Sequence, residues 1–194
     1  ILLAGLLLAA GSGPAPVAYT FRSSPNSMSV EGGSTVHDWS CPIKTLGGTL
    51  RMDTTQTSAA PRFSRVQVAV PVDAIQCDNG TMNEKLREAL QMNAYPEVYF
   101  SLEDAEVSAL PDSGKAWFAV DATGEITLAG ERKQVDLPVK GKRLSDGDVR
   151  FVGSHTIRLS DYDIERPSAM FGAIKTSKEV TVNFDVTATP ETSK

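Results

Sequence analysis

Near its C-terminal end, the chain alternates strictly between apolar and polar residues. In residues 180–186, the even-numbered positions are Val or Phe and the odd-numbered positions are Thr, Asn or Asp. This period of two is typical of a β-strand with one apolar face and one solvated face. The same pattern recurs in residues 65–72, 125–130 and 134–139. Because a sheet of such strands must cover its apolar face, with a second sheet or by closing on itself, the sequence predicts an antiparallel all-β sandwich or barrel.

The spacing of these segments predicts about eight or nine short strands with one helix among them. The helix is expected at residues 83–92, which are rich in strong helix formers and follow a capping segment at residues 79–81. Its apolar stripe would either plug or flank one end of the barrel, or form a gate that moves. Turns are expected at residues 111–114, between strands at 105–110 and 115–122, and at residues 130–133 and 145–148. A loop over one end of the barrel is expected at residues 161–177, and the last strand at residues 179–188.

The first eighteen residues carry no charged side chain, and residues 1–10 are almost entirely Leu, Ile and Ala. This run is shorter than the about 20 apolar residues of a membrane span, and it fits the hydrophobic core of a secretory signal peptide. A buried or disordered tail is the alternative. We therefore expect a signal peptide truncated at its start (1–18), a barrel domain (19–188) and a C-terminal tail (189–194). The mature protein would be periplasmic or secreted, with no stable membrane insertion.

The exported part contains two cysteines, Cys41 and Cys77. In an oxidising compartment such a pair most often forms a disulfide, which would stabilise the fold by roughly 3–4 kcal/mol. Two free buried thiols are the alternative. A metal site is not expected, because His37 is the nearest additional ligand and the chain has only two His residues.

The net charge of −5 argues against nucleic acid and anionic membrane surfaces as partners. The motifs of serine hydrolases, phosphate-binding loops and zinc proteases do not occur in the chain. Asp161, Asp163 and Glu165 could do acid–base chemistry, but a solvated loop is the more common role of such a cluster. We therefore expect no catalytic residues and no enzymatic activity.

Four segments, residues 34–39, 82–100, 124–135 and 159–172, together resemble the YceI-like family of exported lipid-binding proteins. In this chain they begin Ser34-Thr-Val-His-Asp-Trp39 and end at Gly172, and the resemblance covers roughly residues 19–188. It implies a lipocalin-like antiparallel β-barrel of about eight strands, whose apolar interior holds a long isoprenoid chain such as a polyprenyl or quinone tail. It also implies carriage or sequestration without a required cofactor. The opening before His37 is shorter than in longer family members, which leaves the length of the pocket open.

The candidate ligand-binding residues are those expected to face the interior or the mouth of this barrel. They are Val36, His37, Trp39, Val68, Val70, Leu86, Leu90, Phe100, Leu128, His155, Ile157, Met170, Phe171 and Phe184. His37 would either contact a polar head group at the mouth or be a structural His bonded to a backbone carbonyl. His155 shares a strand face with Phe151 and Ile157, and would be either a buried, hydrogen-bonded His or a ligand contact.

Apolar inward faces do not by themselves distinguish a hollow barrel from one filled by its own side chains. A solid-core domain that supports an envelope or redox complex is therefore the alternative function. The sequence leaves the oligomeric state open, with a homodimer as one option.

Overall fold

The structure, a computed structural model, describes residues 16–21, 27–53, 61–110, 117–169 and 174–191. Its strands are β1 (Val17–Phe21), β2 (Ser27–Ser34), β3 (Asp38–Pro42), β4 (Gly47–Asp53), β5 (Arg62–Pro71), β6 (Glu97–Ala109), β7 (Trp117–Leu128), β8 (Glu131–Arg143), β9 (Val149–Arg158), β10 (Ser168–Ala169) and β11 (Ile174–Pro190). The helix α1 (Gly80–Ala89) and two short 3₁₀ helices, η1 (Val72–Ala74) and η3 (Leu159–Tyr162), complete the described elements. Several expected features lie outside the described residues: the signal peptide up to residue 15, the 111–114 turn, the segment with Met170 and Phe171, and the end of the tail from residue 192.

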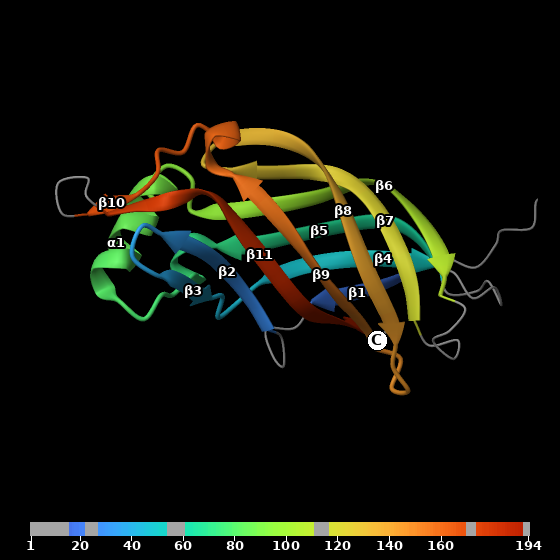
Figure 1. The fold of residues 1–194 in the computed structure, drawn as a ribbon. Coiled ribbons are helices and arrows are strands. Elements are labelled where there is room, and N and C mark those ends of the chain that lie inside the picture. Colours follow the sequence, from blue (N-terminus) through green and yellow to red (C-terminus); the bar gives the residue numbers. More distant parts are fainter. Residues whose placement is uncertain (1–15, 22–26, 54–60, 111–116, 170–173, 192–194) are drawn as a thin grey trace, which may run out of the picture.

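Within the described part of the chain, eight antiparallel strands close into a barrel in the order β1, β4, β5, β6, β7, β8, β9 and β11 (Figure 1). The ring closes because β11 returns to β1, with Tyr19 opposite Pro190 and Phe21 opposite Ala188. The all-β barrel prediction is thereby confirmed.

The long strand β11 shares one of its edges between two partners. Residues 176–185 of β11 pair with β2, whereas residues 188–190 pair with β1. The hairpin of β2 and β3 therefore extends the wall beside α1, and the β1–β4 pair forms the wall at the opposite end (Figure 1). The two ends of the barrel are thus walled by different strands.

Several element boundaries differ from the sequence-based expectation. Residues 117–128 form one continuous strand, β7, where separate strands at 115–122 and 125–130 were expected. The turn expected at 130–133 is a two-residue hairpin loop of Ala129 and Gly130 between β7 and β8. Both loop residues have positive φ, as this tight hairpin type requires. The last strand begins at Ile174, inside the loop expected at 161–177, and ends at Pro190, two residues into the expected tail.

The helix α1 begins three residues earlier than expected because Asn79 caps it. The Asn79 Oδ1 accepts hydrogen bonds from the backbone N–H groups of Thr81, at 2.9 Å, and Met82, at 3.2 Å. An Asn at this position satisfies two donors that a helix otherwise leaves free, so helix formation is favoured from Gly80 onward.

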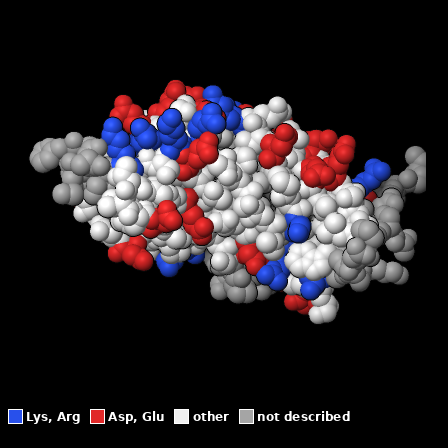
Figure 2. All heavy atoms as spheres, in the orientation of Figure 1, with Lys and Arg blue, Asp and Glu red and all other residues white. Residues whose placement is uncertain are grey.

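Basic and acidic side chains lie interspersed on the face of the molecule shown in Figure 2. They leave wide uncharged areas between them on that face and form no continuous basic stripe there. This distribution fits the net charge of −5 and offers no track for a phosphate backbone on the visible side.

Candidate ligand-binding cavity

The barrel encloses a hollow of about 550 Å³ between its inner faces and α1. A cavity of this volume lies in the range of small-molecule binding sites, roughly 300–1,000 Å³. Its wall is built mainly from the inward positions of the alternating strands, including Val66, Val68 and Val70 on β5 and Val180 and Val182 on β11. The period of two therefore places apolar side chains from successive strands on one continuous surface.

Four phenylalanine rings close the cavity at the end of the barrel opposite α1. Phe63 and Phe151 are the closest pair, with ring centroids 5.9 Å apart, and Phe21 packs against Phe151 at 6.3 Å. Phe118 lies behind these rings, is only 2% exposed and meets both Phe63 and Phe151 within 6.4 Å. We call these four residues the phenylalanine floor.

Below the phenylalanine floor the barrel is filled by its own side chains. Tyr19, Met52, Val149 and Ala188 are at most 4% exposed and do not line the hollow. The barrel is therefore solid at the end that β1 and β4 close, and hollow at the end that carries α1.

The polar residues that line the cavity lie mostly around the α1 end, which we call the mouth. They are Ser34 and His37 at the β2–β3 turn, Asn79, Thr81 and Lys85 on and before α1, Ser168 and Thr176 at β10 and β11, and Tyr99 on β6. Met82 and Leu86 on α1, and Leu90 at its C-cap, turn apolar side chains to the same hollow. The helix thus forms part of the cavity wall, in agreement with the prediction that it flanks one end.

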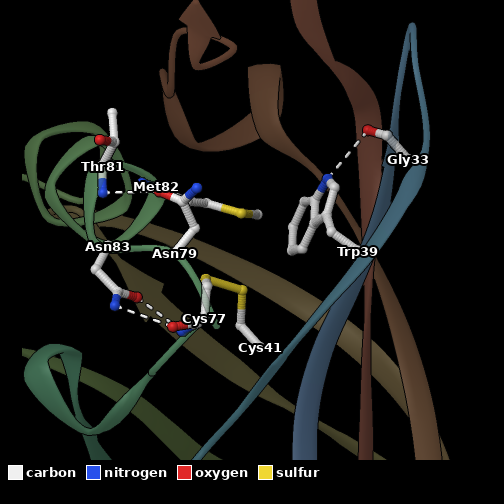
Figure 3. The surroundings of a disulfide bond; sticks show 8 residues. All are labelled: Gly33, Trp39, Cys41, Cys77, Asn79, Thr81, Met82 and Asn83. Atoms are coloured by element: carbon white, nitrogen blue, oxygen red, sulfur yellow. Dashed lines mark hydrogen bonds between the residues drawn. A yellow bond between two sulfur atoms is a disulfide. The ribbon is translucent and has the colours of Figure 1, made fainter.

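A seam next to the mouth joins β3 to the segment before α1, and a disulfide between Cys41 and Cys77 crosses it (Figure 3). Two backbone hydrogen bonds support the seam, from the Gln76 N–H to the Pro42 carbonyl and from the Lys44 N–H to the Ala74 carbonyl, both at 2.9 Å. The predicted pairing of the two cysteines is confirmed. The bond links the β2–β3 hairpin covalently to the rest of the wall.

Asn83 and Trp39 fix the two sides of this seam (Figure 3). The Asn83 side chain accepts a hydrogen bond from the Cys77 N–H at 2.7 Å and donates one to the Cys77 carbonyl at 3.1 Å. On the hairpin, the Trp39 indole N–H donates to the Gly33 carbonyl at 3.2 Å. A Cβ on Gly32 would come within 2.5 Å of the Trp39 ring. The absent side chain at Gly32 therefore lets the indole reach the cavity wall.

His155 projects from β9 into the hollow. It stands opposite Val182 of β11, which on its other side pairs with Val30 of β2, so the imidazole lies between apolar neighbours. Burial lowers the pKa of His155 below its ordinary value, because desolvation disfavours the imidazolium. The ring is therefore neutral at pH 7.

This burial predicts a loss of stability in mild acid. Because the folded state holds the His155 pKa below the unfolded value of about 6.5, the unfolded state binds more protons between those two values, and stability must fall as the pH drops through that window. Chemical denaturation at pH 7.5, 6.5 and 5.5 should show a decrease in the free energy of unfolding that is smaller in His155→Leu. Equal decreases in both proteins would show that protonation of His155 does not cause the loss of stability.

The ion pair of Arg150 and Asp185 acts in a different pH window. The hydrogen bond from the Arg150 guanidinium holds the pKa of the Asp185 carboxyl below its usual value of 3.8. Stability from this pair is lost only as the pH falls below about 4, so it does not interfere with the measurement on His155.

The structure places most of the predicted site residues on the cavity wall. Those that line it are His37, Trp39, Val68, Val70, Leu86, Leu90, Phe100, Leu128, His155, Ile157 and Phe184. Val36 does not line it; its side chain is 63% exposed in the β2–β3 turn. His37 also lies in that turn, before β3 begins, so it does not share a strand face with Trp39. The backbone of His37 is hydrogen-bonded to the Ser34 hydroxyl, and its side chain is exposed at the mouth.

Sequence reasoning missed several lining residues. They include the phenylalanine floor residues Phe21, Phe63 and Phe151, together with Met28 and Val30 on β2. The alternation of Met28 and Val30 with Ser29 and Glu31 was a usable signal, but the following Gly32 and Gly33 obscured it.

The acidic cluster lies apart from this cavity. Asp161, Asp163 and Glu165 are exposed near η3 and do not line the hollow. In the part of the chain that the structure describes, no group of three His, Cys, Asp or Glu side chains could hold a metal ion. Among the same residues, no helix has the length and apolar character needed to span a membrane.

The fold resembles several solved structures at low sequence identity. A polyisoprenoid binding domain from Saccharophagus degradans superposes with a TM-score of 0.66 at 14% identity, over 90% of this chain and 99% of that one. BcnA from Burkholderia cenocepacia gives 0.67 at 15% identity, over 87% and 99%. The YCEI protein of Campylobacter jejuni gives 0.56 at 19% identity, over 78% and 84%.

A search among curated protein sequences gave no significant match. In contrast, the sequence profile of the YceI-like domain matches residues 19–188, which is most of the chain and the whole barrel from β1 to β11 apart from two residues at each end. The protein therefore belongs to the YceI-like domain family.

Proposed function

We propose that this protein is an exported carrier or scavenger that holds a long-chain isoprenoid lipid, of the polyprenyl or quinone type, inside the barrel. The observation that carries the proposal is the hollow of about 550 Å³, walled by hydrocarbon and limited by the phenylalanine floor. The Saccharophagus degradans structure, described as a polyisoprenoid binding domain, has the same fold and supports this ligand class.

The chemistry of the wall suits a ligand that is almost entirely hydrocarbon. Each buried CH₂ group contributes about 0.8 kcal/mol, so a branched apolar chain gains affinity along its whole length without specific polar contacts. Polar side chains gather at the mouth, where a head group would meet water. Binding of this kind requires no catalytic group, and we propose none.

The alternative of a solid-core interaction domain requires the inner faces of the strands to fill the barrel, whereas they stand apart around the hollow.

The disulfide and the uncharged run of residues 1–18 support a periplasmic or secreted location. The protein purified from such a compartment would be extracted with organic solvent and the extract analysed by mass spectrometry. A co-purified polyprenyl or quinone species supports the proposal, whereas empty protein that takes up no added isoprenoid overturns it. Light scattering on the same preparation distinguishes a monomer from a homodimer.

Filling part of the hollow should weaken binding without unfolding the barrel. In Val182→Trp the larger ring would occupy space at mid-cavity that at least two CH₂ groups of a ligand otherwise use, so affinity should fall more than tenfold. Thr181→Trp is the matched control, because the neighbouring side chain points to the outer face and meets Thr156 there. Titration with a fluorescent isoprenoid measures both; equal affinity of Val182→Trp and the unmodified protein would place the ligand elsewhere.

A further inference from the structure

Among the described residues, His155 is the one polar residue of the cavity lining that stands well inside the barrel wall. The others are on α1 and at its N-cap, at the β2–β3 turn, at β10, at the start of β11 and on β6. Along β11, the mouth residue Thr176 is followed inward by Val180 opposite Ile157, then by Val182 opposite His155. The imidazole is therefore at least one full step below the mouth, in surroundings that are otherwise apolar.

The ring of His155 has hydrogen-bonding capacity that the protein does not use. A neutral imidazole offers one N–H donor and one nitrogen acceptor. None of the described residues forms a hydrogen bond with this ring, although every neighbouring strand contributes side chains to the hollow. The ring is partly buried, and a ligand that fills the hollow would remove the water that can still reach it. A polar group removed from water without a partner is unfavourable, and buried polar groups are nearly always bonded. When a ligand occupies the cavity, the partner of this ring therefore has to come from the ligand.

We propose that His155 anchors the ligand by hydrogen bonding to a single uncharged oxygen, a hydroxyl or a carbonyl, that the isoprenoid carries inside the barrel. The inference rests on the proposed function and names the chemistry of the ligand more closely. An all-hydrocarbon chain would leave the imidazole unpaired, so the site favours an isoprenoid alcohol, phenol or quinone.

The same surroundings disfavour a phosphate at this depth. Burying an anion is costly unless several donors or a cation compensate it. Val30, Ile157 and Val182 offer neither, and among the described residues the cation that lines the hollow is Lys85, on α1 at the mouth. Any anionic group of a ligand is consequently expected outside, beside Lys85, rather than at His155.

The position of His155 also orients the chain. Phe151 in the phenylalanine floor lies four residues earlier on β9, and four residues of antiparallel strand span about 14 Å. An oxygen held at His155 leaves that length of hollow below it for hydrocarbon. The carbon chain next to the oxygen would then lie against Phe184 and the floor.

A matched pair of ligands tests the proposal. Geranylgeraniol and the hydrocarbon with the same skeleton but no hydroxyl would compete against an environment-sensitive apolar dye bound to the protein. The unmodified protein should prefer the alcohol roughly three- to tenfold, the worth of one hydrogen bond. In His155→Leu the preference should disappear, with the hydrocarbon bound at least as tightly as before. His155→Gln should keep part of the preference, because an amide can still donate and accept. Thr156→Leu, on the outer face, is the control.

A second readout separates hydrogen bonding from packing. The imidazole nitrogen resonances of His155 should shift when the alcohol binds and change little with the hydrocarbon. Failure of the protein to bind either ligand would overturn the proposed function itself. Equal affinity for both ligands, unchanged in His155→Leu, would overturn the role of His155 and leave the carrier function intact. Tighter binding of geranylgeranyl phosphate than of the alcohol, insensitive to His155→Leu, would also overturn it.

Discussion

Replacing both cysteines, in Cys41→Ala with Cys77→Ala, should lower the free energy of unfolding by about 3–4 kcal/mol. The disulfide closes a loop with a sequence separation of 36 residues, and the chain without it has more conformational freedom when unfolded. Thermal unfolding should shift down by about 6–16 °C, from 2–4 °C for each kcal/mol in a domain of this size. Calorimetry and urea denaturation of the two proteins measure the change.

Reduction provides the control for this result. Dithiothreitol should destabilise the unmodified protein by a similar amount and leave the double variant unchanged. The destabilised protein should also exchange ligand faster, because the seam then depends on the hydrogen bonds of Lys44 and Gln76. Equal stability of the reduced and oxidised proteins would show that the backbone bonds alone hold the seam.

Phe118→Ala should destabilise the barrel by about 3–5 kcal/mol, the usual cost of removing a buried phenylalanine. Phe118 is 2% exposed and supports Phe63 and Phe151 from behind. Its ring also fills the space over Gly141, where a Cβ would come within 2.2 Å of it. Removing the ring would leave a void that continues the hollow, so the variant should accept a longer isoprenoid chain than the unmodified protein. Urea denaturation and mass spectrometry of the bound lipids test the two effects.

Trp117→Ala is the matched control, since Trp117 precedes Phe118 on β7 and points to the outer face. Its ring packs under the Lys142 ammonium, with the Nζ 5.5 Å from the centroid, and an exposed contact of this kind is worth only about 0.5–1 kcal/mol. It should leave the bound chain length unchanged. A loss of stability as large as that of Phe118→Ala would contradict the role given to the phenylalanine floor.

Strand alternation predicted an all-β sandwich or barrel, the family resemblance selected the barrel, and glycines account for much of what the alternation missed. The expected break after residue 122 does not exist, because Gly124 continues β7 and accommodates the Ser101 carbonyl, 2.5 Å from where a Cβ would stand. A glycine inside a strand can mark a close approach rather than a turn. Gly32 is a similar case on β2, where the space goes to the Trp39 ring.

The cavity could be predicted only in part. Inward residues such as Val68 and Ile157 follow from the period of two, but that period is the same on the hollow and the filled parts of the barrel. Leu50 on β4 lines the hollow and Met52, two residues along the same face, belongs to the filled core. The difference depends on how side chains of eight strands meet across the axis, and no single segment carries that information.

The divided edge of β11 bears on where a ligand would enter the cavity. Hydrogen bonds between residues 188–190 and β1 keep the solid end shut, while the hairpin beside the hollow is held to the helix side by one covalent link and a short run of backbone bonds. Local opening of a protein has the lowest free-energy cost in regions with few such bonds. If the proposed ligand enters beside α1, only the contacts between the hairpin and the helix side need to open locally, and the pairing of β1 with β11 can remain intact.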